Sequence, residues 1–361
     1  NYARLDLSFS QSLVAFVGDN GMGKTNILEA ISLLTAGRGL RRAPFQEVAR
    51  LTGSGSWAVS ASVVCNGMET RIGTGHTAGE PGRRVRIDGE DAKSSDSLLD
   101  YMRVLWLVPA MDGLFTGPAG DRRRFLDRLT LSLDPQHGRR VTDFEKALRQ
   151  RNRLLDQGGS DGFLNAIEQQ VAELGTAVSI ARQETVSLLG ETLRLQAESG
   201  LPFPSGTLAL TGAFETATIG MSASDREDHY GELLREGRGR DRAAGRTLMG
   251  PHLSDLEVHH TTKAMPAAKS STGEQKALLI GLVLAHAELT TSVSGMTPIL
   301  LLDEVAAHLD PGRRSALFHK LLALGSQVFM TGTDSSLFAD LPGDSELFRI
   351  EGGTATRELP D

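Results

Sequence analysis

A glycine-rich segment near the start of the chain has the residue types and spacing of a phosphate-binding loop. Residues 18–25 read Gly-Asp-Asn-Gly-Met-Gly-Lys-Thr and match the pattern G-x-x-x-x-G-K-[ST] without a mismatch. Glycines lack a Cβ, so the backbone can curl and point its N–H groups at phosphate oxygens. In such a loop the charge of Lys24 meets the β- and γ-phosphates, and the Thr25 hydroxyl can ligate Mg²⁺. The candidate nucleotide contacts of this segment are Gly18, Asn20, Gly21, Gly23, Lys24, Thr25 and Asn26.

The elements expected on either side of this loop fit that role. Residues 12–17 are a short apolar run typical of a strand, and residues 26–34 predict a helix. The N-terminus of that helix would face the loop, where free N–H groups and the helix dipole favour an anion. A glycine-rich turn that matched by accident would lack this strand–loop–helix context, so the context favours a true phosphate site.

A second candidate for nucleotide chemistry lies near the end of the chain. Residues 298–304 read Pro-Ile-Leu-Leu-Leu-Asp-Glu, an apolar strand that ends in two acids, as in a Walker B motif. A continuous apolar run indicates a buried parallel strand, and ligands lie at the carboxyl ends of such strands. Asp303 would hold Mg²⁺ directly or through water. Glu304 would be the general base for the attacking water, so the predicted catalytic residues are Glu304 and Lys24.

A third motif precedes the acidic strand. Residues 270–276 read Ser-Ser-Thr-Gly-Glu-Gln-Lys and lead into a long apolar helix expected over 277–289. The stretch resembles the signature motif of the ATP-binding-cassette (ABC) class, which binds the γ-phosphate of ATP held by the other subunit. That resemblance implies nucleotide contacts from Ser271, Gly273 and Glu274, and from Asp310 at the place of the D-loop. For Ser271 to Gly273 alone, an ordinary helix cap is the alternative interpretation.

The segment between the two halves of the nucleotide site is largely helical. Helices are expected over 121–133 and 139–155, and residues 163–195 predict one long helix that packs against the second of these. Its expected seam consists of apolar or small residues spaced by three and four: Phe163, Ile167, Val171, Leu174, Val178, Ala181, Thr185, Leu188, Thr192 and Leu195. A dimerising rod would need far more heptads.

The predicted fold class is therefore α/β. We expect an ABC-type P-loop ATPase head formed by residues 1–108 and 246–361, split by a largely helical lobe at 109–245, without a long coiled coil. Further strands of the head are expected from alternating or apolar patterns at the following ranges: 4–9, 57–65, 69–72, 85–87, 104–108 and 256–260. Residues 201–213 show another strand pattern. Asp88-Gly89 is a hairpin signal, and residues 74–84 are expected to form a loop.

Composition limits the class of protein. The chain has 361 residues, 40% of them hydrophobic and 23% charged, which is typical of a soluble globular protein. We find no run of about 18 apolar residues and expect no membrane span. The single cysteine, Cys65, excludes an intramolecular disulfide and fits a reducing, cytoplasmic setting.

The charge balance leaves the question of nucleic-acid binding open. The net charge is −7, but only seven of the 38 basic residues are lysine, and arginine suits bidentate phosphate contacts. Local clusters that could contact DNA phosphates are Arg122, Arg123, Arg124, Arg149, Arg151 and Arg153. The equal alternative is that they pair internally with Asp121, Asp127, Asp143 and Glu145. The arginine-rich stretch 222–245 is likewise either a solvated helix and loop or an anion-binding surface.

The chain as a whole resembles the bacterial recombination mediator family RecF. The stretches that carry the resemblance are Asn1-Tyr2 with Leu5-Asp6-Leu7, 18–29, Gly117-Pro118 with 122–127, 148–152, 250–252 with Asp255-Leu256, 271–276 and 300–304. The resemblance implies a protein that dimerises on ATP, hydrolyses it slowly and binds DNA, both double-stranded and at gaps or single-strand/double-strand junctions. It implies ATP and Mg²⁺ as cofactors, RecO and RecR as partners, and help in loading RecA.

Two positions depart from the wider ABC class. Residues 331–334 read Thr-Gly-Thr-Asp where transporters carry a switch histidine, so Thr333 or Asp334 is the candidate for sensing the γ-phosphate. No glutamine occupies the place of the Q-loop at 109–113, where Asp112 is the candidate substitute.

Two other functional classes remain as alternatives. An ATPase subunit of a membrane transporter would have a compact head and a surface that couples to a membrane partner. A structural chromosome-organising protein would need far longer coiled-coil arms. The helical insert argues against the first alternative, and the shortness of that insert argues against the second.

Overall fold

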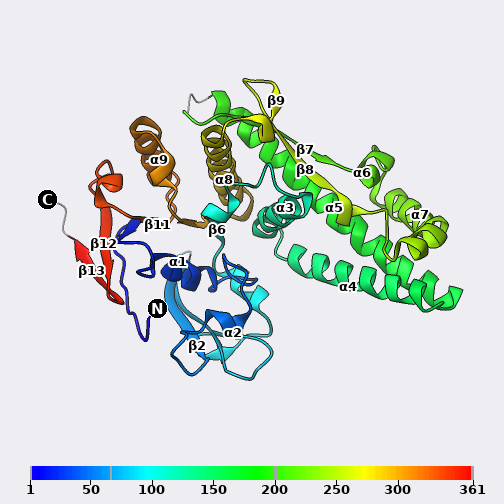
Figure 1. Ribbon diagram of the computed structural model, residues 1–361, viewed down its shortest axis with the longest axis horizontal. Coiled ribbons are helices and arrows are strands. Elements are labelled where there is room, and N and C mark those ends of the chain that lie inside the picture. The colour runs from blue at the N-terminus through cyan, green and yellow to red at the C-terminus, as the bar shows by residue number, and fades with distance from the viewer. Residues whose placement is uncertain (1, 66, 199–201, 359–361) are drawn as a thin grey trace. The chain divides into compact units, whose positions relative to one another are not determined.

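The computed structural model describes residues 2–65, 67–198 and 202–358 (Figure 1). The chain divides into two units. Unit 1 consists of Asn1–Asp112, Gln196–Pro204 and Ser271–Asp361, and unit 2 consists of Gly113–Leu195 and Ser205–Ser270. Unit 1 thus unites the two ends of the chain, as expected for a split α/β head, and unit 2 is inserted into it.

The central sheet of unit 1 has six strands in the order β13-β12-β1-β11-β10-β6. All neighbours are parallel except the antiparallel pair β12–β13. The strands are β1 (Leu13–Val17), β6 (Val104–Leu107), β10 (Ile299–Leu302), β11 (Val328–Gly332), β12 (Ser345–Glu351) and β13 (Thr354–Glu358). Every residue of β1, β6 and β11 is buried, which is the property that a continuous apolar run predicts for a strand of a covered parallel sheet, and it holds here even for the edge strand β6.

Helices and a second sheet complete unit 1. The helices are α1 (Lys24–Ser32), α2 (Phe45–Val48), α8 (Thr272–Ser294) and α9 (Pro311–Ala323), with 3₁₀ turns at Ser95–Asp100, Pro109–Met111, Ala306–His308 and Ser335–Phe338. α8 is long and apolar enough to pass as a membrane span on length and composition, but 72% of its apolar 18-residue stretch is buried inside the protein. That burial is the environment of a core helix.

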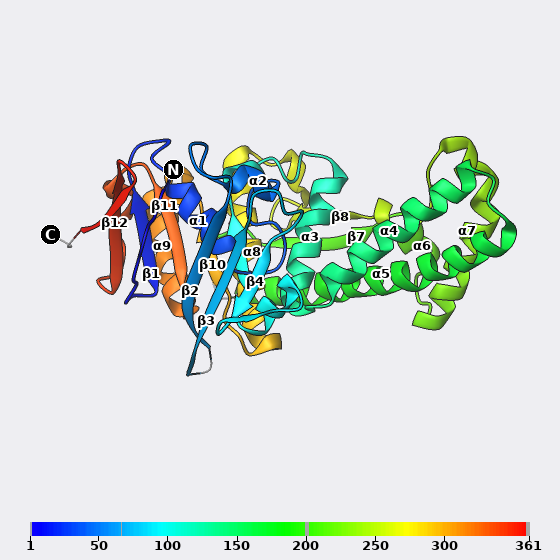
Figure 2. The ribbon, with the colours of Figure 1, turned by 90° about the horizontal axis from the view of Figure 1, so that it is seen from below.

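The second sheet of unit 1 is an antiparallel meander. Its strands are β2 (Trp57–Cys65), β3 (Met68–His76), β4 (Arg84–Ile87) and β5 (Glu90–Asp91), and the long β2–β3 pair is drawn in blue in Figure 2. The predicted strand 57–65 is confirmed residue for residue. The hairpin signal is also confirmed, since Asp88 and Gly89 both have the positive φ that a tight β-turn between β4 and β5 requires. The loop expected from residue 74 begins later, because β3 continues to His76.

The strand expected at 4–9 is wrong. Leu5, Leu7 and Phe9 do alternate with exposed residues and pack on the core of unit 1, but the segment has no strand assignment. The alternation of apolar and polar residues therefore predicted correctly which side chains face the core. A strand also needs a neighbouring backbone to pair with, and this segment has none assigned.

Unit 2 is built from five helices and a three-stranded antiparallel sheet. The helices are α3 (Ala119–Leu133), α4 (His137–Asp156), α5 (Asp161–Glu198), α6 (Ala213–Ala217) and α7 (Ala223–Ala244), with 3₁₀ turns at Pro251–Leu253 and Ala267–Lys269. The strands are β7 (Gly206–Thr211), β8 (Asp255–His260) and β9 (Met265–Pro266), in the order β7-β8-β9. Of the strand pattern at 201–213, residue 201 lies outside the described residues.

The expected domain boundary between residues 245 and 246 is wrong. Strand β8 pairs along its whole length with β7, from Thr211 opposite Asp255 to Gly206 opposite His260, and β9 extends the same sheet. This pairing keeps residues up to Ser270 in unit 2, so the chain returns to the head at Ser271. The boundary expected after residue 108 lies at Asp112 instead.

The long helix is confirmed, but its predicted seam is only partly right. Ile167, Val171 and Val178 are buried in the core shared by α4, α5 and α7, whereas Phe163, Leu188 and Leu195 are 70%, 45% and 53% exposed. A straight helix drifts about 20° per heptad from a strict seven-residue repeat. The buried stripe therefore shifts to neighbouring positions at the helix ends, namely Leu164, Val186, Leu189 and Leu193.

A buried ion-pair network joins α4, α5 and α7. Arg151 is fully buried, and its guanidinium donates to Glu168 at 3.1 Å, Asp241 at 2.7 Å and Thr247 at 2.8 Å. Buried charges are tolerated only when they are paired and hydrogen-bonded, and this guanidinium is both. Arg151 therefore cannot contact DNA, which corrects one member of the arginine set expected to do so.

Helix α5 passes close to the aromatic core at Gly175. A Cβ built on this residue would lie 2.6 Å from Cε1 of Tyr230 and 2.9 Å from Cε2 of Phe144, both of them buried. The absence of a side chain lets α4, α5 and α7 pack against one another at this level.

We predict that Gly175→Ala destabilises the protein by up to about 2 kcal/mol, since the ~1–3 kcal/mol cost of overpacking outweighs the ~1 kcal/mol that alanine gains over glycine in a helix. The matched control is Gly190→Ala in the same helix, where a Cβ meets nothing within 4 Å, and it should be stabilising. Urea unfolding of both variants measures the difference. Equal stabilisation by the two substitutions would contradict the close packing at Gly175.

Candidate functional site

The glycine-rich loop connects the carboxyl end of β1 to the start of α1. Gly18, Gly21 and Gly23 have φ values of 150°, 83° and 108°, a region that residues with a Cβ rarely adopt. A Cβ on Gly18 would also lie 2.4 Å from the carbonyl oxygen of Ile350 in β12. The backbone thus requires glycine at these motif positions, and the loop ends at the N-terminus of α1, where N–H groups are free to bind an anion.

The Lys24 side chain lies folded over this loop. It is 5% exposed, and its ammonium donates to the carbonyl oxygens of Gly18 at 2.5 Å and Asp19 at 3.0 Å. These carbonyls satisfy a buried charge in the free chain. The same ammonium would reach phosphate oxygens by leaving its two carbonyl partners.

The acidic strand end lies beside the glycine-rich loop. The Thr25 hydroxyl donates to the Asp303 carboxylate, at 3.1 Å from Oδ1 and 3.2 Å from Oδ2. Asp303 is 5% exposed and also accepts a hydrogen bond from the Thr331 hydroxyl, at 2.7 Å. The fold brings Thr25 and Asp303 together, because β11 lies between β1 and β10 and all three strands are parallel.

Glu304 follows directly and has an unusual backbone. Its φ is 54°, the left-handed region that is disfavoured for residues with a Cβ, and its N–H donates to the Thr331 hydroxyl at 2.9 Å. Among the described residues, the Glu304 carboxylate has no hydrogen-bond or ion-pair partner, so it is available to a water molecule. Uncommon backbone conformations of this kind concentrate at functional sites.

The donor set fits Mg²⁺. Thr25 and Asp303 supply a hydroxyl and a carboxylate, hard oxygen ligands that already lie side by side. Magnesium is usually bound by one or two protein oxygens, with water and substrate phosphates filling the other positions. Within the described residues no three His, Cys, Asp or Glu side chains gather to hold a metal.

Comparison with known proteins identifies the family. Residues 1–355 match the family described as RecF/RecN/SMC N terminal domain. A DNA replication and repair protein RecF of Mesorhizobium japonicum is 55% identical over 98% of this chain and 94% of its own length. The protein of the same name from Brucella suis biovar 1 is 56% identical over 99% of this chain and 93% of its own length. The chain belongs to the RecF family.

Solved structures agree with this assignment at the level of fold. A structure described as the recombination mediator protein RecF-ATP in the RecFOR pathway superposes with a TM-score of 0.87 over 99% of this chain and 95% of the other, at 23% identity. An Smc head domain from Pyrococcus furiosus superposes with a TM-score of 0.53 at 14% identity, over 98% of this chain and 91% of the other. The ABC-type head predicted from the sequence is thus shown.

In this RecF-family chain the signature residues form a helix cap. Ser271 is the N-cap of α8: its hydroxyl accepts from the Glu274 N–H at 3.4 Å, and the Glu274 carboxylate accepts from the Ser271 N–H at 3.0 Å. This reciprocal arrangement is a capping box. Ser271 and Gly273 are both exposed, and a Cβ on Gly273 would meet nothing within 4 Å. The capping interpretation is therefore correct for the free chain, and it leaves this surface open to a ligand.

The other residues predicted to contact nucleotide are Asp310, Asn26, Asn20 and Thr333, and they differ in their hydrogen bonds. Asp310 is the N-cap of α9 and accepts from the Arg313 N–H at 2.9 Å. The Asn26 side chain accepts from Arg41 at 2.7 Å, while Asn20 and Thr333 are exposed without such a bond among the described residues.

Asp334 has a local role that the sequence did not suggest. Its carboxylate caps the 3₁₀ turn Ser335–Phe338 by accepting from the Ser336 N–H at 2.7 Å, and hydrogen bonds from Ser336 lower the pKa of that carboxyl. The neighbouring Thr331, which no sequence signal marked as a site residue, is the one that contacts Asp303.

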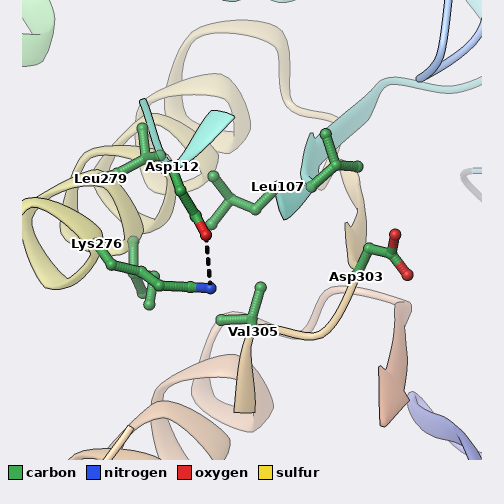
Figure 3. A pocket seen from close by; sticks show the side chains of 8 residues that line it. Leu107, Asp112, Lys276, Leu279, Asp303 and Val305 are labelled. Atoms are coloured by element: carbon green, nitrogen blue, oxygen red, sulfur yellow. Dashed lines mark hydrogen bonds and ion pairs between the residues drawn. The ribbon is translucent and has the colours of Figure 1, made fainter. Parts of the chain in front are cut away.

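Asp112, at the place of the Q-loop, faces the signature helix. Its carboxylate pairs with the Lys276 ammonium of α8 at 3.3 Å, and both line a small pocket whose wall also includes Leu107, Leu279, Val305 and Asp303. Figure 3 shows Lys276 reaching Asp112 while the Asp303 carboxylate points away from the pair. In the free chain, Asp112 is therefore a partner of the signature helix.

Proposed function

We propose that this chain is an ATP-dependent DNA-binding protein of recombinational repair and replication restart, with a slow ATPase activity. The observation that carries the proposal is the contact between Thr25 and Asp303, since it joins a complete phosphate-binding loop to an acidic strand end. The identity of the chain to full-length relatives named DNA replication and repair protein RecF supports the biological setting. The same relatives argue against the alternative of a transporter subunit.

The residues of the head can perform ATP hydrolysis in the following way. The loop N–H groups and Lys24 bind the phosphates, and Thr25 and Asp303 hold Mg²⁺, which would neutralise phosphate charge in the transition state. Glu304 accepts a proton from the attacking water through its unpartnered carboxylate. No histidine stands in segment 331–334 to contact the γ-phosphate, which supports a slow turnover.

We further propose that ATP binding dimerises the chain. Ser271 and Gly273 form an exposed helix N-terminus, the kind of surface that binds an anion, and they would meet the γ-phosphate of ATP held by Lys24 of a second copy. Gly273 supports this proposal, because its own chain gives no steric reason for a helix-disfavouring glycine in the first turn of α8. A partner's phosphate approaching this backbone would supply such a reason.

The proposed DNA substrate is double-stranded DNA and its junctions with single strands, as at gaps, and the proposed partners are RecO and RecR in loading RecA. One solved structure with this fold is described as a recombination mediator in the RecFOR pathway, which supports the setting. Of the arginines expected to contact phosphate, Arg122 is held by Asp255 through two bonds of 2.7 Å, and Arg123 donates to the Ser254 carbonyl. Arg124 pairs with Asp121, and Arg149 lies 3.7 Å from Glu145, so the alternative of internal pairing holds for these two. Both are exposed, as is Arg153, and the three remain as candidates for contact with phosphate.

We predict that Glu304→Gln keeps ATP affinity but lowers turnover by roughly 10²–10⁴-fold, because an amide cannot accept the proton of water. Lys24→Ala should instead weaken nucleotide binding, since the charge at the phosphates is lost. Calorimetric ATP titration and steady-state ATPase assays separate the two effects. Glu69→Gln, the same change at an exposed site on β3, is the control; a normal rate for Glu304→Gln would reject Glu304 as the base.

We predict that Ser271→Arg binds ATP as a monomer, since its side chain would fill the place of the partner's γ-phosphate while leaving the P-loop intact. Ser271→Asp is the sharper variant, because aspartate is an equally good N-cap but repels phosphate. It should keep the stability of α8 and still fail to dimerise. Sedimentation velocity with saturating ATP is the measurement, and a normal dimer peak for both variants would place the signature residues outside the interface.

We predict that replacing Arg149 and Arg153 by glutamine lowers the dependence of DNA affinity on salt. Each phosphate contact contributes about 0.7–0.9 to the slope of log affinity against log salt, so the double variant should lose about 1.4–1.8. Arg86→Gln is the control, because Arg86 is as exposed as Arg149 but lies in unit 1, and its pair with Asp91 at 2.8 Å is shorter than that of Arg149 with Glu145 at 3.7 Å. An unchanged slope in the double variant rules out both contacts.

A further inference from the structure

The Thr331 hydroxyl links the two acidic residues of the site. Thr331 is 1% exposed at the carboxyl end of β11, where its hydroxyl donates to Asp303 Oδ1 at 2.7 Å and accepts from the Glu304 N–H at 2.9 Å. Strand register explains the position: Leu302 of β10 pairs with Met330 of β11, so the next residue on each strand is Asp303 and Thr331. One side chain thus contacts both the metal-ligand candidate and the backbone of the base.

We propose that Thr331 is a positioning residue for ATP hydrolysis, which fixes the orientation of the Asp303 carboxylate and the peptide group that leads into Glu304 together. The inference rests on the proposed ATPase function and adds a residue that the sequence motifs do not include. A β-branched side chain suits the task, because its χ1 angle is restricted and the hydroxyl keeps one direction.

The bond to Asp303 comes from a residue that would not itself ligate the metal. In the free chain Asp303 accepts hydrogen bonds from both Thr25 and Thr331. Thr25 would ligate Mg²⁺ through a lone pair of its hydroxyl oxygen, which leaves its O–H able to donate to the carboxylate. Thr331 would hold the same carboxylate from outside the set of ligands, in the way that outer hydrogen bonds orient metal ligands in other proteins.

The bond to Glu304 fixes the peptide group that precedes an unusual backbone. Glu304 has a φ of 54°, at which its Cβ crowds its own backbone. The hydroxyl of Thr331 accepts from the Glu304 N–H at 2.9 Å and so holds the plane of the peptide group between Asp303 and Glu304. Because the Glu304 side chain leaves the chain from this plane, Thr331 also limits where the base points.

The test compares Thr331→Val, which keeps the shape and loses the hydroxyl, with Thr331→Ser, which keeps the hydroxyl and loses the methyl. For Thr331→Val we expect kcat to fall, or the Mg²⁺ concentration for half-maximal rate to rise, by about 10–100-fold. ATP affinity measured without metal should be unchanged. Thr331→Ser should stay close to the wild-type chain in all three quantities.

A second readout needs no turnover. Hydrogen exchange of the Glu304 amide in the nucleotide-free protein should be slow in the wild type and in Thr331→Ser, and faster in Thr331→Val. If Thr331→Val does not fold, Thr331→Ala takes its place in both comparisons.

The proposal would be overturned if Thr331→Val kept the kcat and the Mg²⁺ requirement of the wild type. It would also be overturned if Thr331→Ser lost as much activity as Thr331→Val, or if the Glu304 amide exchanged at the same rate in both variants. A wild-type chain that hydrolyses no ATP would instead refute the proposed function, and the exchange comparison would still test the role of Thr331.

Discussion

The candidate site depends on the hydrogen bond between Thr25 and Asp303, two residues separated by 278 positions in the sequence. It forms because the fold places β1 and β10 on either side of β11 in a parallel sheet. Each strand contributes its carboxyl end: β1 leads into the phosphate-binding loop, Asp303 and Glu304 directly follow β10, and Thr331 is the residue before the last one of β11. Insertion of a second unit between the halves of the head is compatible with this arrangement, since the three strands pair in the same way wherever the intervening chain goes.

Helix capping and the proposed nucleotide binding use the same groups at two positions of this head. Ser271 and Asp310 both cap the N-termini of helices in the free chain, and both are candidates for contact with nucleotide. The coincidence has a physical basis, because a helix N-terminus offers free N–H groups that either a side chain or a phosphate can satisfy. Alanine at such a position would remove cap and contact together, so only substitutions that keep the cap can separate stability from nucleotide binding.

The sequence predicted the parts of the site that are defined by local chemistry. The glycines of the loop are required by its backbone, and Asp303 and Glu304 follow an apolar strand, so motif and context sufficed for both. Thr331 escaped prediction because its contacts with Asp303 and Glu304 arise from the register of β11 against β10, which sequence spacing alone does not reveal.

In unit 2, too, the sequence did not reveal which residues pack against one another. Arg151 looked like its exposed neighbours Arg149 and Arg153, yet it is fully buried, because Glu168 and Asp241 meet it from two other helices. The seam of α5 was predicted in its middle and missed at its ends, where helix geometry departs from a strict heptad. The boundary of unit 2 was missed because the pairing of β7 with β8 spans the whole of α6 and α7.

The central claim is that the γ-phosphate of ATP joins two copies of this chain. The most direct measurement is the mass of the wild-type chain by sedimentation velocity at one Mg²⁺ concentration, with ATP, with ADP and without nucleotide. The account predicts a 38.7 kDa monomer without nucleotide and with ADP, and a species of twice that mass with ATP. A monomer in ATP, or the same dimer in ADP, would contradict it.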